Sequence, residues 1–98
     1  MAYIPATNVL SPKKQWSLIA VLEDNGPSQE SLALGRWDNK LCLAMRWNGT
    51  NDNPIGNPQS RGLPTWFIVP EGYVEAILGA DTLTADKLSL ARNFFPAA

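Results

Sequence analysis

The sequence predicts a small α+β domain in which a four-stranded, mainly antiparallel sheet carries two C-terminal helices on one face. Three observations predict this class. Segments rich in strand-forming residues come first along the chain, segments with helical spacing come last, and the two kinds do not alternate. Strands followed by helices separate into an α+β arrangement, here in the order β-β-β-loop-β-α-α. A length of 98 residues accommodates one domain, residues 1–98.

The first strand is predicted from a near-continuous apolar run. Residues 1–12 contain Pro5 and Pro12 and show little periodicity, so we expect an irregular lead-in that lies across the domain. Residues 16–22 (WSLIAVL) are rich in strand formers and have the length of a central strand. The run stops at residues 23–27, where acidic residues, Asn, Gly and Pro make a dense turn signal.

A β-hairpin is the clearest local prediction. Residues 32–37 and 41–47 each form an apolar run, and they flank Asp38 and Asn39. Both of these residue types tolerate positive φ, which a two-residue hairpin turn requires. The sequence therefore predicts two antiparallel strands joined at this turn.

The register of the hairpin, with Trp37 opposite Lys40, sorts its side chains onto two faces. The large-residue face carries Leu32, Leu34, Leu41, Leu43, Met45 and Trp47, with Arg36 among them. The small-residue face carries Ala33, Gly35, Cys42 and Ala44, rimmed by Trp37, Lys40 and Arg46. We expect the large-residue face to form the main core. A packed element or a second subunit would explain the small-residue face, and we place the subunit interface of a homodimer at Ala33, Gly35, Trp37 and Ala44.

The second part of the chain predicts a loop, a strand and two helices. Residues 48–64 are rich in Gly, Pro and Asn and are expected to be irregular, and residues 65–69 form a short apolar strand. Pro70 suits the first position of a helix, which Gly79 then closes. A second helix is expected to start within residues 81–84, which include capping residue types, and to stop before Pro96.

Composition excludes several kinds of chemistry. The chain has no histidine and one cysteine, so we expect no metal site, no cofactor and no His-based nucleophilic pair. The net charge is −1 and the basic residues are scattered, which argues against nucleic acid as a partner. No apolar run approaches the ~20 residues that span a bilayer. We expect a cytoplasmic protein with no membrane partner, in which Cys42 is buried and inert.

Residues 48–64 are the candidate site, because long irregular loops in small domains usually have a function. Antiparallel topology places them at the same end of the sheet as the turn after the first strand; we call this the loop end. An arginine at a strand end suits bidentate recognition of a carboxylate or phosphate, although it can instead pair with an acid and fix the loop. The predicted ligand-binding residues are Arg46, Asn48, Asn57, Gln59, Ser60 and Arg61.

The four tryptophans are assigned from their position in the pattern. Trp16, Trp47 and Trp66 lie on apolar strands and are expected in the core. Trp37, beside the hairpin turn, is expected to be partly exposed, where it would anchor a protein contact.

Residues 46–50 (RWNGT) and 56–67 (GNPQSRGLPTWF) resemble a stretch found in small uncharacterised bacterial proteins of accessory or mobile DNA, such as gene cassettes and plasmids. The resemblance implies a bacterial, cytoplasmic protein, and it transfers no functional residue to this chain.

These observations predict a non-enzymatic binding module, a homodimer, that recognises a protein or a small anionic ligand through residues 48–64. One alternative is a small enzyme that uses a carboxylate of Glu23, Asp24 or Asp52 with arginine support. Another is an inhibitor or regulator of a nucleic-acid enzyme encoded on a mobile element.

Overall fold

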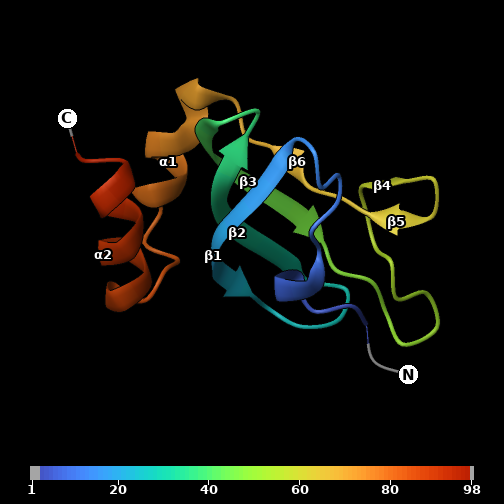
Figure 1. The fold of residues 1–98 in the computed structure, drawn as a ribbon. Helices are drawn as coiled ribbons and strands as arrows, with labels where there is room; N and C mark the ends of the chain where they lie inside the picture. Colours follow the sequence, from blue (N-terminus) through green and yellow to red (C-terminus); the bar gives the residue numbers. More distant parts are fainter. Residues whose placement is uncertain (1–2, 98) are drawn as a thin grey trace.

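Four antiparallel strands form the central sheet of the protein in a computed structural model that describes residues 3–97 (Figure 1). The first two residues of the predicted lead-in lie outside the described residues. The sheet has the order β1-β2-β3-β6, formed by Trp16–Asp24, Glu30–Trp37, Lys40–Trp47 and Phe67–Ile68. A second, two-stranded ladder joins β4 (Gln59–Ser60) to β5 (Leu63–Pro64). The helical elements are η1 (Ala6–Asn8), η2 (Glu71–Tyr73), α1 (Val74–Leu78) and α2 (Ala85–Phe94). The predicted α+β class is confirmed.

The hairpin of β2 and β3 has the predicted register, with Trp37 opposite Lys40. Its turn residues Asp38 and Asn39 have φ of 51° and 66°, the left-handed conformation that these residue types tolerate. Strand β6 continues the sheet by pairing Met45 with Phe67. The local turn chemistry therefore fixes which side chains share each face of the sheet.

The large-residue face of the sheet forms the main core. Leu22, Leu32, Leu34 and Leu43 are buried there. The C-terminal helices α1 and α2 lie beside one another on one side of the sheet and supply the opposing side chains (Figure 1). Those side chains are Val74, Leu78 and Ala91, together with Val69 from the segment before α1.

Both predicted helices are present, and the first is shorter than expected. It begins as the 3-10 turn η2 after Pro70 and becomes α-helical only at Val74, consistent with the low helix propensity of Gly72. The Thr84 side chain accepts a hydrogen bond from the Lys87 N–H at 3.3 Å and so caps α2. None of the helices in the described part of the chain is long and apolar enough to cross a membrane.

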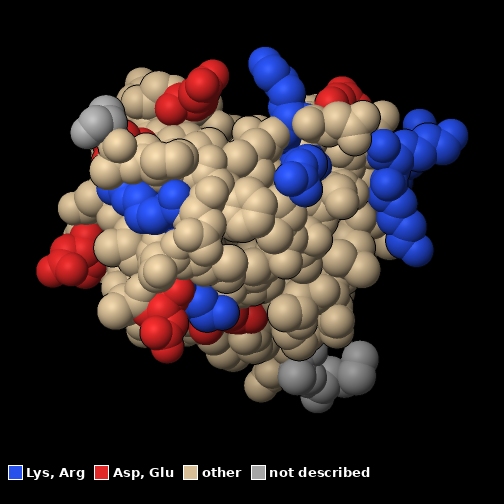
Figure 2. All heavy atoms as spheres, turned by 60° about the vertical axis from the view of Figure 1, so that its left-hand side comes forward, with Lys and Arg blue, Asp and Glu red and all other residues tan. Residues whose placement is uncertain are grey.

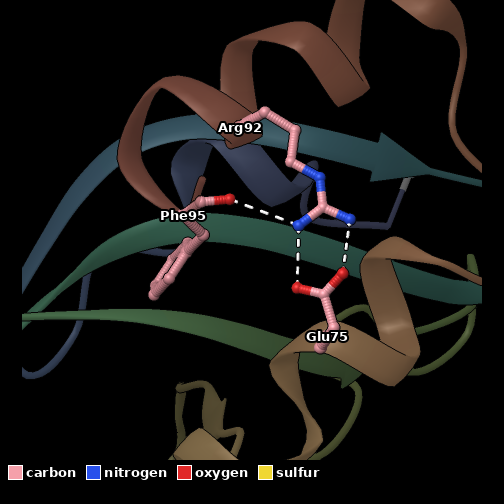
Figure 3. Close-up of polar contacts among 3 residues, drawn as sticks. All are labelled: Glu75, Arg92 and Phe95. Atoms are coloured by element: carbon pink, nitrogen blue, oxygen red, sulfur yellow. Dashed lines mark hydrogen bonds and ion pairs between the residues drawn. The ribbon is translucent and has the colours of Figure 1, made fainter. Parts of the chain in front are cut away.

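An ion pair joins the two helices at the surface. The Arg92 guanidinium donates to both carboxylate oxygens of Glu75, at 2.7 and 2.8 Å, and also to the carbonyl oxygen of Phe95 at 3.3 Å (Figure 3). The bond from Arg92 outweighs the effect of desolvation and lowers the pKa of Glu75. One arginine thus connects α1 with α2 and with Phe95, the residue that follows α2.

The small-residue face is covered by the N-terminal segment of the same chain. Ala6 and Val9 pack with Ala33 and Ala44 in a second core, and all four are fully buried. Two rings complete this core, since Trp16 and Trp66 lie 5.8 Å apart between centroids.

This covering corrects the predicted subunit interface. Ala33, Gly35 and Ala44 are buried beneath their own chain, and only Trp37 of the predicted set keeps a partly exposed side chain. The small residues are needed because the N-terminal segment and the Trp16 ring approach the strands closely. That the protein is a homodimer stays a prediction.

Gly35 marks the closest of these approaches and yields a test. A Cβ atom there would lie 2.4 Å from Trp16 Cη2 and 2.7 Å from the Ser17 carbonyl oxygen. Overpacking of this kind costs about 1–3 kcal/mol, so Gly35→Ala is expected to lower the free energy of unfolding by that amount in urea titrations. Gly72→Ala is the control, because nothing lies within 4 Å of its Cβ position. Equal unfolding midpoints for the two variants would contradict the packing described.

Candidate functional site

The loop over residues 48–64 is held against the sheet by the side chain of Arg46. This side chain is only 4% exposed. Its guanidinium donates hydrogen bonds to the carbonyl oxygens of Ile55 and Thr65, and to that of Pro58 at 3.4 Å. Burial lowers the pKa of Arg46, and the nearby charge of Asp24 opposes that shift.

Arg46 is therefore an internal support of the loop, which corrects its assignment as a ligand-binding residue. The sequence also allows an arginine that fixes the loop, with an acidic side chain as its partner. The hydrogen-bond acceptors are instead backbone carbonyl groups of the loop and of the segment that leaves it. Backbone acceptors leave no trace in the sequence.

Asn48 is a second internal support and not a free ligand-binding group. It is also 4% exposed. Its Oδ1 accepts from the Ser31 hydroxyl at 2.8 Å, while its Nδ2 donates to Asp24 Oδ1 at 3.0 Å and to the Gly26 carbonyl oxygen at 2.9 Å. One amide thus joins three segments at the loop end.

Asp24 connects the same end of the sheet to the N-terminal segment. Besides Asn48, its carboxylate accepts from the Tyr3 hydroxyl at 2.7 Å, the Ala6 N–H at 3.0 Å and the Gly26 N–H at 3.1 Å. Desolvation on its own would raise the pKa of Asp24, but these hydrogen bonds outweigh it and hold the pKa below its usual range. Because the Asp24 carboxylate accepts these hydrogen bonds within the protein, its role is structural. This weighs against the alternative in which Asp24 is the carboxylate of an enzyme.

The loop is ordered and contains a short regular element. Asn57 pairs with Trp47 through two backbone hydrogen bonds of 2.8 and 3.0 Å, so the chain returns alongside the end of β3. Strands β4 and β5 follow, although no strand was expected between residues 48 and 64. Their turn uses positive φ at Arg61 and Gly62, 53° and 77°.

The other predicted ligand-binding residues are all exposed. Asn57, Gln59, Ser60 and Arg61 lie on or next to the β4–β5 hairpin, at the outer side of the loop. The Gln59 amide donates to the Gly56 carbonyl oxygen at 3.4 Å. The structure therefore separates the predicted set into two buried supports and four accessible residues.

A surface groove of about 520 Å³ opens where the loop meets the sheet. Two of its side chains are large and exposed, Trp47 at 59% and Phe67 at 56%. Met45 and Pro58 add further apolar surface, and Glu30 stands at its side. Arg46 and Asn57 complete the lining.

The exposure of Trp47 corrects its assignment to the core. Trp47 shares a face with Leu43 and Met45, as the hairpin register requires. Along this face, Leu43 is fully buried in the main core and Met45 is partly buried against it. Trp47, two residues further along β3, lies outside the core. The groove is thus the uncovered end of the large-residue face, next to the loop.

Glu30 is the accessible charged group of the groove. It lies opposite Trp47 in the register of β2 and β3, and its carboxylate accepts one hydrogen bond from Asn25 Nδ2 at 3.3 Å.

On the face shown in Figure 2, the basic side chains stand in separate groups with uncharged surface between them. That face lacks the continuous basic surface with which nucleic-acid binders neutralise phosphates.

Trp37 and Cys42 lie near a smaller hollow, of about 230 Å³, beside the hairpin turn. Trp37 is partly exposed, as predicted. Cys42 is buried, and desolvation raises the pKa of its thiol, which fits the predicted inert role. Within residues 3–97, no three His, Cys, Asp or Glu side chains come together in a way that could hold a metal ion.

Comparison of the chain with protein-family profiles, with curated protein sequences and with solved structures gives no match. The resemblance to proteins of mobile DNA therefore stays a prediction, and the functional proposal rests on the groove itself.

The role of Arg46 can be tested by Arg46→Lys, which keeps the charge but replaces the planar fork by a single ammonium group. A single ammonium group cannot donate hydrogen bonds to all of the separated carbonyl groups at once. Each buried acceptor left without a donor lowers the free energy of unfolding by about 1–3 kcal/mol. We expect a loss of that size in urea unfolding and faster proteolysis within residues 48–64. The matched change Arg61→Lys, at an exposed position, is expected to shift stability by less than about 0.5 kcal/mol. Equal effects would show that the guanidinium does not support the loop.

The low pKa of Asp24 predicts how stability changes with pH. Its folded-state pKa lies below the unfolded value of about 3.9, so its contribution is present above pH ~4 and is lost as the pH falls through the folded-state pKa. Asp24→Asn is expected to destabilise the protein at pH 7 and to flatten the decline in stability below pH 4. Tyr3→Phe removes one of the hydrogen bonds and should give a smaller effect of the same kind. An unchanged acid profile in Asp24→Asn would contradict this account.

Proposed function

We propose that the protein is a non-enzymatic binding module that holds a segment of a partner protein in the groove of Met45, Trp47, Pro58 and Phe67. The observation that carries the proposal is the exposure of two large aromatic rings, Trp47 and Phe67, in one groove. Aromatic side chains dominate the energetics of protein interfaces, because they bury much apolar area with few rotatable bonds.

The size and setting of the groove support binding of a partner segment. A volume of about 520 Å³ falls within the range of about 300–1,000 Å³ that is common for binding sites. Complete burial of a large apolar side chain yields roughly 1.5–3 kcal/mol. Trp47 and Phe67, each a little more than half exposed, offer about half of this gain apiece. Trp47 lies on β3, and the carbonyl oxygen of Pro58 accepts a hydrogen bond from Arg46. Because both residues are already held in place, binding costs little conformational entropy of the protein.

A small anionic ligand is supported less well. An anion is bound most strongly by a cationic donor, and the guanidinium of Arg46 is buried and already bonded to the loop carbonyls. Arg61 is exposed, but it is not among the residues that line the groove. The apolar groove therefore favours the protein-binding form of the proposal.

The proposal can be tested with a neutral apolar probe, the peptide acetyl-Leu-Met-Leu-amide, titrated into ¹⁵N-labelled protein. We expect saturable shifts of the Trp47 indole N–H and of residues around the groove. Phe67→Ala should weaken binding about 5- to 30-fold, the effect of losing about 1–2 kcal/mol at an aromatic anchor.

The control for this titration is Leu63→Ala, because Leu63 is 55% exposed and does not line the groove. It should bind the probe like the original protein. Absence of a saturable shift at Trp47, or equal weakening by the two variants, would overturn the proposal.

A further inference from the structure

We infer that the partner segment presents a basic side chain, arginine or lysine, to Glu30 beside the aromatic groove. This inference rests on the proposed function and specifies the chemistry of the segment that the groove accepts. Its basis is the position and charge of the groups around Trp47.

The first argument is geometric. Glu30 on β2 and Trp47 on β3 are directly opposite in the antiparallel register, so their side chains project from the same face of the sheet. Residues opposite each other have Cβ atoms about 4.5–5.5 Å apart. Both residues line the same groove. A carboxylate and an indole ring thus flank one position, where a cation can contact the two together.

The second argument concerns which charges a ligand can reach. The positive charge of Arg46 lies in a side chain that is 4% exposed and bonded to loop carbonyl groups. The Glu30 carboxylate is partly exposed, and among the described side chains its hydrogen-bond donor is Asn25 alone. A carboxylate offers about four acceptor sites, so capacity remains for a further donor.

The third argument is the sign of the charge at this end of the sheet. Glu23 and Asp24 end β1, and the register places them opposite Leu32 and Ser31, within two residues of Glu30 on β2. Asp24 thus lies on the small-residue face beside Arg46, whereas Glu23 shares the face of Glu30 and Trp47. Asn25 Nδ2 donates to Glu23 Oε2 at 3.5 Å and to Glu30 Oε1 at 3.3 Å, so two carboxylates lie close together on the face of the groove. A field of this sign favours a cation in the groove and repels a carboxylate or phosphate.

The aromatic rings suit the same ligand. A guanidinium or ammonium group is attracted to the face of a tryptophan ring. Arginine and lysine also carry apolar stems that can cover a surface while the charged end stays in water. Met45 and Phe67 offer surface for such a stem, with Glu30 and Trp47 for its charged end.

The experiment compares three peptides with the same flanking residues in the titration of ¹⁵N-labelled protein. They are acetyl-Leu-Arg-Leu-amide, the peptide with uncharged citrulline in place of arginine, and the peptide with glutamate in that place. We expect the arginine peptide to bind about three- to tenfold more tightly than the citrulline peptide, and the glutamate peptide to bind most weakly. The preference should shrink as salt is added.

Two substitutions connect this preference to Glu30. Glu30→Gln keeps the size of the side chain and is expected to reduce the preference for arginine over citrulline to less than about twofold. Asp38→Asn is the matched control, because it also removes one carboxylate but lies in the turn at the opposite end of the hairpin. This variant should keep the full preference.

The outcomes separate the inference from the proposed function. Binding of the neutral methionine peptide without any preference for arginine over citrulline would overturn the inference and leave the binding groove in place. Tighter binding of the glutamate peptide would also overturn it, in favour of an anionic ligand. An unchanged preference in Glu30→Gln would show that another group selects the cation. If none of the peptides saturates, the proposed function fails as well.

Discussion

The burial of the Arg46 guanidinium is the interaction on which the loop end of this protein depends. A loop with many prolines and glycines makes few backbone hydrogen bonds of its own, and its carbonyl groups need donors when they are covered. Arg46 supplies these donors from the sheet to Ile55, Pro58 and Thr65. The carbonyl dipoles and the charge of Asp24 in turn stabilise the buried cation. Pro58 is thereby placed as one wall of the groove.

Asp24 and Asn48 extend this support to the rest of the loop end. Their hydrogen bonds reach Ser31 on β2, the turn at Gly26 and the N-terminal segment at Ala6. Of the six residues predicted to bind a ligand, Arg46 and Asn48 are therefore engaged within the protein, whereas Asn57, Gln59, Ser60 and Arg61 stay accessible. The two buried side chains support the loop, and the groove beside them is mainly apolar, with the Glu30 carboxylate and Asn57 at its lining.

The sequence predicted the features that local chemistry determines. Asp38 and Asn39 specify the hairpin turn, alternation then assigns each side chain to a face, and Thr84 caps α2. Trp47 was assigned to the core because alternation shows the face of a residue, but not how far the helices cover that face. The role of Arg46 depends on backbone acceptors, which no pattern reveals. The N-terminal segment has no periodicity, so its position over Ala33 and Ala44 could not be specified.

The two faces of the hairpin are covered by segments on either side of it in the sequence, the small-residue face by Ala6 and Val9 and the large-residue face by Ala91 and its neighbours. This arrangement has a consequence for the order of events during synthesis on the ribosome. The hairpin can receive its N-terminal cover as soon as β3 has emerged. Its large apolar face must remain open until α1 and α2 are made, because Leu78 and Ala91, which close it, are translated well after β3.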